Sequence, residues 1–383
     1  MPKPQRTVLT FDEKQSLYRD GYVVVRGAVP PELVAAALER IERATKGDGL
    51  ANDGALTDLV NRSCITPILR EVMGDFDLVT ACQPGIHQRR DPGDFFMPTG
   101  YRDRELPYYG AEVHMDGAIT IAPPQTPLEG TPDEVYRTYF ASGPKGDLGR
   151  SAEVMGHNMT PMFQDPAMTL GLGSFTAFLF VCLNDQLVEG CGQTAVIPGS
   201  HHAVESFFRW QRSVNGHIGP EGPGWPRLRH DVPNHCGLIY APDAVMEQFI
   251  DETSECTPDG RRWPRPTQVM MRAGDVAIAT YHILHTVTRN ERGSESRKNI
   301  IFRVRNKRRQ PDKVLTGVSD HPDRGWHGEF LEYEPGNDPW ERSKDAMCDM
   351  WSEWDGMSSA LAVDRSHSMN GRSGFRSRLD NVQ

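Results

Sequence analysis

From about residue 75 onward, short apolar runs alternate with clusters of Gly, Pro and Asp. Several of these runs have the length and the β-branched or aromatic content of strands. They are DLVTACQPG, AEVHMDGAITIAPP, GSFTAFLFVCLND, GQTAVIPGS, QVMMRAGDVAIATYHILH and RKNIIFRVRNK. No helical pattern alternates with them, which argues against a parallel sheet built from βαβ units. The pattern predicts a mainly β fold, an antiparallel barrel or jelly roll.

The first 75 or so residues are predicted to be mainly helical. TFDEKQSLYRDG has the signature of a capped helix, with Thr10 as N-cap, Glu13 completing a capping box and Gly21 at the end. YVVVRG then reads as a strand, and VPPELVAAALERIERATKG as a helix. Its expected apolar stripe comprises Leu33, Ala36, Ala37 and Ile41. A further helical stretch, DLVNRSCITPILREVMG, is expected to break near Pro67.

Two segments are too long and too rich in Pro, Gly and charge for compact strand spacing. They cover residues 123–170 and 203–266, and loops of this length are commonly functional lids. We therefore predict one domain over residues 1–307, with a jelly-roll core at about 75–307 and these two segments as inserts. Residues 308–383 are predicted to form a polar, partly mobile C-terminal extension.

Composition narrows the expected partners and compartment. The formal net charge of -10 argues against a nucleic acid or an anionic membrane as a partner. No apolar run reaches the roughly 18 residues of a membrane span, and the N-terminus lacks the apolar stretch of a secretory signal. Seven scattered cysteines without a CxxC spacing argue against a disulfide framework and a thiolate zinc site. A cytoplasmic protein with a small-molecule partner is the expectation.

The stretch AEVHMDGAI places a histidine and an aspartate two positions apart. On a strand, His114 and Asp116 would share one face while Met115 points the other way. An imidazole and a carboxylate side by side are two of the three ligands of a 2-His-1-carboxylate iron site. A hydrogen-bonded pair in a core is the commoner explanation of this motif, so the metal interpretation needs a third ligand.

A third ligand is available in RAGDVAIATYHILHTVTRNERGSESRKNIIF. His285 is preferred over His282, which an odd separation of three would place on the opposite face of a strand. Arg297 opens the next strand 12 positions later and can present a bidentate fork to a carboxylate. Arg292 competes for this role, but it lies in a loop beside Gly293 and is expected to be a solvated surface charge.

Together these motifs resemble the phytanoyl-CoA dioxygenase family of Fe(II)- and 2-oxoglutarate-dependent oxygenases. HxD, EGCGQTAVIPGSHH, AGDVAIATYHILHTVTRN and the trailing arginine follow in the family's order, after an opening similar to FDEKQSLYRDGYVVVRG. The resemblance runs from about residue 10 to 307 and implies a double-stranded β-helix core. It further implies Fe(II) held by His114, Asp116 and His285, with Arg297 pairing with the distal carboxylate of 2-oxoglutarate.

The implied activity is that of a dioxygenase using 2-oxoglutarate and O2 as cosubstrates. It would hydroxylate or otherwise oxidise an unactivated C–H bond of a small organic substrate, such as one of secondary metabolism, and release succinate and CO2. An aspartate at 116 argues against the halogenases of this chemistry, in which a small residue replaces the carboxylate. Desaturation, cyclisation and epimerisation stay open. So do a cupin-type metalloenzyme that does not use 2-oxoglutarate and a non-catalytic jelly-roll binding module.

The sequence departs from the family pattern in three ways. Val287 stands where the family often has a small hydroxyl residue that helps to hold the cosubstrate. Arg297 lies one position farther along than expected, and 169 residues separate Asp116 from His285. Other motif positions read as structural: Asn290 as a turn cap, Gly199 as a tight turn, and His201 and His202 as turn and surface residues.

Substrate contacts are expected from the segments that flank the motifs. His87 and Arg89 lie one predicted strand upstream of the HxD motif, and Tyr109 directly precedes it. Aromatic walls with a few fixed polar groups suit a small organic substrate. These three residues are the predicted substrate-binding set.

Overall fold

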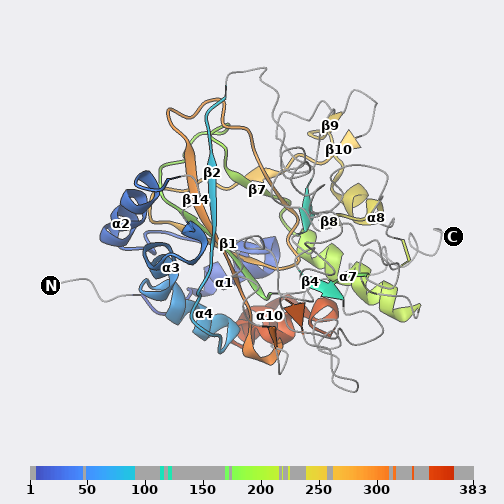
Figure 1. Ribbon diagram of the computed structural model, residues 1–383. Helices are drawn as coiled ribbons and strands as arrows, with labels where there is room; N and C mark the ends of the chain where they lie inside the picture. Colours follow the sequence, from blue (N-terminus) through green and yellow to red (C-terminus); the bar gives the residue numbers. More distant parts are fainter. Residues whose placement is uncertain are drawn as a thin grey trace.

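Two antiparallel sheets and a layer of helices make up the described part of the chain (Figure 1). The computed structural model describes residues 6–45, 49–90, 113–115, 120–122, 169–171, 175–214, 218, 223–224, 239–256, 262–309, 314–315, 330–331 and 345–365. The first sheet lies between the helical layer and the second sheet, so it is covered on both faces.

The first sheet has five strands in the order β1-β12-β6-β14-β2, each antiparallel to its neighbours. Their bounds are β1 Tyr22–Val25, β12 Val276–Thr280, β6 Ala177–Cys182, β14 Arg297–Val304 and β2 Gln83–His87. Strands from both ends of the chain therefore pair in one sheet, with β1 against β12.

The second sheet also has five antiparallel strands, in the order β11-β7-β13-β3-β8. They are β11 Thr267–Gln268, β7 Thr194–Val196, β13 His285–Val287, β3 His114–Met115 and β8 Ile239–Tyr240. Three strand pairs complete the set: β4 Thr120–Ala122 with β5 Thr169–Gly171, β9 Glu255–Cys256 with β10 Arg262–Trp263, and β15 Val314–Leu315 with β16 Phe330–Leu331. The predicted antiparallel β class is thus confirmed, whereas the jelly-roll winding stays a prediction.

Side-chain alternation along β6 explains how one strand serves two cores. Leu179 and Val181 pack with the helical layer, whereas Phe178, Phe180 and Cys182 pack toward the second sheet. Successive side chains of a strand point to opposite faces, so a strand buried on both faces must be apolar throughout. All six residues of β6 are buried, as its unbroken apolar sequence requires.

The helical layer contains α1 Phe11–Asp20, α2 Pro31–Glu42, α3 Gly54–Asn61 and α4 Ile65–Met73, with a short helix η1 at Leu50–Asn52. The predicted capping box between Thr10 and Glu13 is present, and Gly21 ends α1 with φ 81°. The predicted position of the helix break, near Pro67, is wrong in detail. The break falls at residues 62–64, and Pro67 sits in the first turn of α4, where a missing N–H costs nothing. Ala36 is exposed; Val34 takes its place in the apolar stripe.

A buried helix begins the segment predicted as the second insert. α7 spans Ser200–Ser213 and packs Val204, Phe207 and Phe208 into the core between the sheets. Gly199 precedes it with φ 80°, which confirms the predicted tight turn. His201 is completely buried on α7, so its prediction as a turn or surface residue is wrong. The short helices α8 Asp243–Met246 and η3 Glu247–Phe249 follow.

Part of the predicted C-terminal extension packs into the core. Short helices η6 Met350–Glu353 and η7 Asp355–Met357 lead into α10 Ser358–Arg365, after η4 at Lys307–Arg309. Trp354 is 1% exposed and Met357 is fully buried in the core of the helical layer. The described residues 345–365 are therefore a structural element of the domain, while the predicted boundary at residue 307 stays a prediction.

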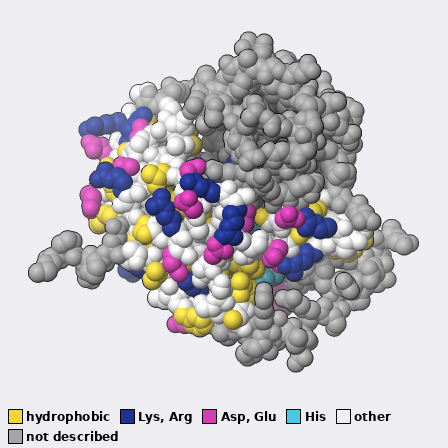
Figure 2. All heavy atoms as spheres, turned by 90° about the horizontal axis from the view of Figure 1, so that it is seen from below, with side chains coloured by type: hydrophobic (Ala, Val, Ile, Leu, Met, Phe, Trp, Pro, Cys, Tyr) yellow, Lys and Arg dark blue, Asp and Glu magenta, His cyan; other side chains and the backbone are white. Residues whose placement is uncertain are grey.

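The surface offers mixed charge. Figure 2 shows Lys and Arg side chains next to Asp and Glu side chains across the described part of one face. Within the described residues, no helix is both long and apolar enough to cross a bilayer.

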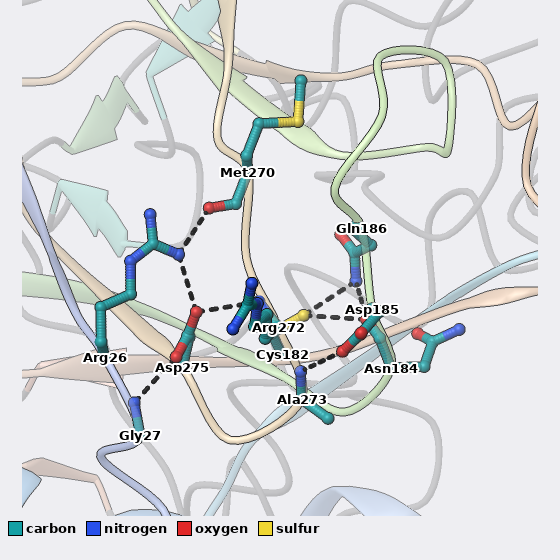
Figure 3. Close-up of polar contacts among 10 residues, drawn as sticks. All are labelled: Arg26, Gly27, Cys182, Asn184, Asp185, Gln186, Met270, Arg272, Ala273 and Asp275. Atoms are coloured by element: carbon teal, nitrogen blue, oxygen red, sulfur yellow. Dashed lines mark hydrogen bonds and ion pairs between the residues drawn. The ribbon is translucent and has the colours of Figure 1, made fainter.

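A buried carboxylate joins the first sheet to the turn before β12 (Figure 3). Asp275, 3% exposed, accepts hydrogen bonds from Arg26 Nη1 (2.7 Å), Gly27 N (2.8 Å) and Arg272 N (2.8 Å). Charged acceptors make stronger hydrogen bonds than neutral ones. This single side chain thus fixes both the end of β1 and the entry to β12.

We expect Asp275→Asn to lower the free energy of unfolding by about 2–3 kcal/mol, because an amide cannot accept all three bonds and leaves a buried donor unsatisfied. Asp185→Asn is the matched control, since exposed Asp185 accepts one bond, from Ala273 N; it should cost at most about 1 kcal/mol. Urea denaturation measures both. Equal losses would contradict the role given to Asp275.

His201 predicts an acid-dependent stability. Burial lowers its pKa well below the ordinary value, with His202 as a further cause, and its Nε2 lies 2.8 Å from the Tyr18 carbonyl oxygen. The unfolded chain therefore binds this proton first, so its stability contribution is complete above a pH of about 6.5 and is lost as the pH falls. Between pH 7 and 5, His201→Asn should show a shallower loss of stability than the native chain. Parallel curves would contradict this.

Candidate functional site

Two histidines from distant parts of the sequence meet in the second sheet. Strand β13 pairs with β3 so that His285 lies directly opposite His114. Their ring centroids are 4.6 Å apart, and the residues are 6% and 7% exposed. Side chains of directly paired residues point to the same face of a sheet, so both imidazoles are available to one ligand.

The hydrogen bonding of His285 favours one tautomer. Its Nδ1 lies 3.2 Å from the carbonyl oxygen of Ile283, an arrangement in which Nδ1–H donates and Nε2 keeps its lone pair. Metal-binding histidines generally donate their second ring N–H in this way. His285 thus has the hydrogen-bond arrangement of a metal-binding histidine, and its role as a ligand stays a prediction.

Aromatic side chains of the first sheet cover this histidine. The rings of Phe178 and Phe180 lie 4.8 Å and 6.1 Å from the His285 ring, centroid to centroid, and both residues are 2% exposed. An apolar wall excludes water and lowers the local dielectric, which strengthens electrostatic interactions inside the site. The two histidines thus lie at the interface between the sheets.

Two predicted site residues, Asp116 and Tyr109, lie outside the described residues. Among the side chains that are described, no group of three or more His, Cys, Asp or Glu could hold a metal ion. The described part of the chain therefore supplies two of the three predicted ligands, and the role of Asp116 stays a prediction.

His282 is kept apart from this pair, although not for the predicted reason. It lies in the turn between β12 and β13 instead of on the strand, and its Nε2 is 2.8 Å from the carbonyl oxygen of Met347. This contact ties the turn to the C-terminal segment. The structure thus gives His282 a structural partner and gives His285 the place beside His114.

Arg297 is a buried cation at the start of β14. It is 2% exposed, and its Nε has no hydrogen-bond partner among the described residues. No carboxylate of the described residues forms an ion pair with it. The nearby Cys182 does not compensate, because burial raises the pKa of that thiol to about 12 and keeps it neutral. Burial also lowers the pKa of Arg297 to about 10, so the guanidinium is still charged at neutral pH.

A buried charge without a counter-ion is costly, so it requires an explanation. Arg297 shares the interior face of the first sheet with the aromatic wall, as strand alternation along β14 and its register with β6 require. Arg292, the competing arginine, is exposed in the loop. The arrangement thus combines two imidazoles with a buried cation that can accept an anionic ligand.

Asn290 closes the loop before Arg297. Its Nδ2 donates to the carbonyl oxygens of His87 (3.1 Å) and Glu295 (2.9 Å), which confirms the predicted turn-capping role. Of the predicted substrate residues, His87 is half-buried and pairs in register with Arg297, whereas Arg89 is exposed beyond the end of β2. The register places His87 closer to the anion site, and the substrate role of both residues stays a prediction.

Sequence reasoning missed the residues around the guanidinium. Asn299 lies two positions after Arg297 on the same strand face and is completely buried, and Gly85 lies opposite it on β2. Strand alternation from Arg297 could have identified Asn299. No local signal marks Gly85, because its contact depends on the register of β2 against β14.

Comparisons with known proteins give only distant structural likeness. No protein-family model matches the chain, and no curated protein matches it. Solved structures with low identity do match. Apo HygX from Streptomyces hygroscopicus is 13% identical with a TM-score of 0.35, covering 78% of this chain and 86% of that chain.

HygX with nickel and 2-oxoglutarate bound is 13% identical, with a TM-score of 0.37 over 77% of this chain and 87% of that chain. The epimerase SnoN in complex with Fe3+, alpha ketoglutarate and nogalamycin RO is 14% identical. Its TM-score is 0.36, and the match covers 76% of this chain and 80% of that chain. These scores are too low to carry an inference to this chain. The resemblance to the phytanoyl-CoA dioxygenase family stays a prediction.

The cost of burying Arg297 is testable without any ligand. Because the guanidinium has no described carboxylate partner, Arg297→Met should raise the free energy of unfolding of the ligand-free protein by about 1–3 kcal/mol. Lys298→Met is the control, since this partly buried lysine pairs with Glu295 at 2.7 Å and its loss should be near neutral. Chemical denaturation measures both, and a clear destabilisation by Arg297→Met would contradict the assignment.

Proposed function

We propose that the protein is a non-haem Fe(II)- and 2-oxoglutarate-dependent oxygenase with a jelly-roll core. The observation that carries the proposal is the pairing of His114 with His285 on one sheet, together with a buried, uncompensated Arg297 on the facing one. Two neutral imidazoles and a carboxylate suit Fe(II), and a buried guanidinium suits a second carboxylate. His114, His285 and Asp116 would hold the metal.

Arg297 separates this proposal from a cupin-type metalloenzyme or a binding module. A metal site alone gives no reason to bury a cation on the facing sheet. A dicarboxylate that chelates the metal through one end would place the negative charge of its other end against the guanidinium of Arg297.

In this reaction the protein's residues bind and orient the metal and the cosubstrate, and they exclude water from the site. Bound Fe(II) would supply the activation of O2, coupled to the conversion of 2-oxoglutarate to succinate and CO2, that oxidises a C–H bond of the substrate. His285 is oriented by its Nδ1 contact, Arg297 holds the distal carboxylate, and Phe178 and Phe180 keep water from the site. We propose a small organic substrate, hydroxylated or otherwise oxidised, with His87 facing it.

The decisive experiment is spectroscopic. The anaerobic protein should give a weak visible charge-transfer band with Fe(II) and 2-oxoglutarate, because the cosubstrate chelates the metal. His285→Ala and Asp116→Ala should abolish the band. His282→Ala is the matched control and should keep it, since His282 contacts Met347 instead. A band that persists in both ligand variants would overturn the assignment.

A further inference from the structure

The surroundings of Arg297 hold a chain of buried amides. Asn299 is fully buried and Gln186 is 1% exposed, and their side-chain amides approach to 2.7 Å. Gln186 also contacts the Cys182 sulfur and the Asn184 carbonyl oxygen, each at 3.2 Å (Figure 3). These hydrogen-bonded amides connect the loop after β6 with β14, the strand that carries Arg297.

Hydrogen bonding sets the orientation of Asn299. With its oxygen toward the guanidinium, Oδ1 accepts from Arg297 Nη1 at 3.1 Å while its nitrogen donates to the Lys298 carbonyl at 3.0 Å. The opposite orientation would point the NH2 group at the cation. When Gln186 nitrogen faces Asn299, Gln186 Oε1 has no partner. Gln186 packs against the far side of the Asn299 amide at 2.7 Å, and its Nε2 also donates to the Asn184 carbonyl oxygen.

This chain fixes the guanidinium without neutralising it. An amide oxygen accepts one N–H and carries no net charge, so the positive charge is kept for a ligand. Within the part of the chain that the structure describes, Arg297 Nε has no acceptor, so this donor remains for a ligand. A carboxylate at position 299 would have formed an internal ion pair and competed with any external anion.

Gly85 provides the remaining space. A Cβ at this position would lie 3.2 Å from Arg297 Nη1 and 3.3 Å from the Asn299 carbonyl oxygen. Such contacts are tighter than ordinary packing, so any side chain at 85 would displace the guanidinium. Interiors are packed closely enough for a single methyl group to be felt.

From these contacts we infer that Asn299, supported by Gln186, and Gly85 are positioning residues that hold Arg297 ready for the distal carboxylate of a 2-oxo diacid. The inference rests on the proposed function and deepens it. It assigns selectivity for a diacid over a 2-oxo monoacid to a neutral amide beneath the cation. The same groups act on ligand binding and need not touch the metal.

The test compares two ligands in direct binding. The native protein, loaded with Ni(II), is titrated with 2-oxoglutarate and with 2-oxovalerate, which has the same chain length but lacks the distal carboxylate. Asn299→Asp should weaken 2-oxoglutarate binding at least tenfold and leave 2-oxovalerate within about twofold, because the new carboxylate pairs with Arg297. Asn61→Asp, in the helical layer, adds the same charge where the native amide pairs with the Val79 backbone, and should change neither.

Gly85→Ala provides a second variant that adds no charge. It should weaken 2-oxoglutarate binding about three- to tenfold and spare 2-oxovalerate. Gly54→Ala is its control, because a Cβ at Gly54 would meet nothing within 4 Å. Circular dichroism confirms that each variant is folded. The inference is overturned if both variants lose affinity for the two ligands equally, or lose none. The proposed function still stands in that case, provided that the native protein binds 2-oxoglutarate. If the native protein does not bind 2-oxoglutarate, the proposed function itself fails.

Discussion

The pairing of β13 with β3 is the interaction on which the candidate site depends. It sets His285 opposite His114, although the two residues are 171 positions apart in the sequence. A slip of one residue in this register would turn one of the imidazoles to the other face of the sheet. Because β13 also pairs with β7, it is held on both sides. The strand that carries His285 is therefore the central strand of the second sheet.

The electrostatics of the interior complement this geometry. The imidazole of His285 lies against an aromatic wall and beside that of His114, and a buried cation lies on the facing sheet with an amide beneath it. Each feature costs stability when no ligand is present, because polar and charged groups are removed from water. Together they favour one kind of ligand, a metal-chelating anion with a second negative end. The fold tolerates the cost through its large apolar cores, one on each face of the first sheet.

Local patterns predicted much of this structure. The capping box of α1 and the antiparallel strands followed from spacing and alternation. The same reasoning preferred His285, although a turn and not strand alternation sets His282 apart from His114. The errors arose where tertiary contacts decide. GSHH read as a turn, but the apolar residues that follow make α7 an amphipathic helix and bury His201. The contact of Gly85 with Arg297 and the packing of Trp354 link parts of the chain that are far apart in sequence, and no local period encodes them.

The most direct test is an experimental structure of the protein with Ni(II) and 2-oxoglutarate. The account predicts one metal ion bonded to the imidazoles of His114 and His285 and to Asp116, with the distal carboxylate of the diacid within hydrogen-bond distance of Arg297. A metal bound at other residues, or a carboxylate that leaves Arg297 without an anionic partner, would contradict it.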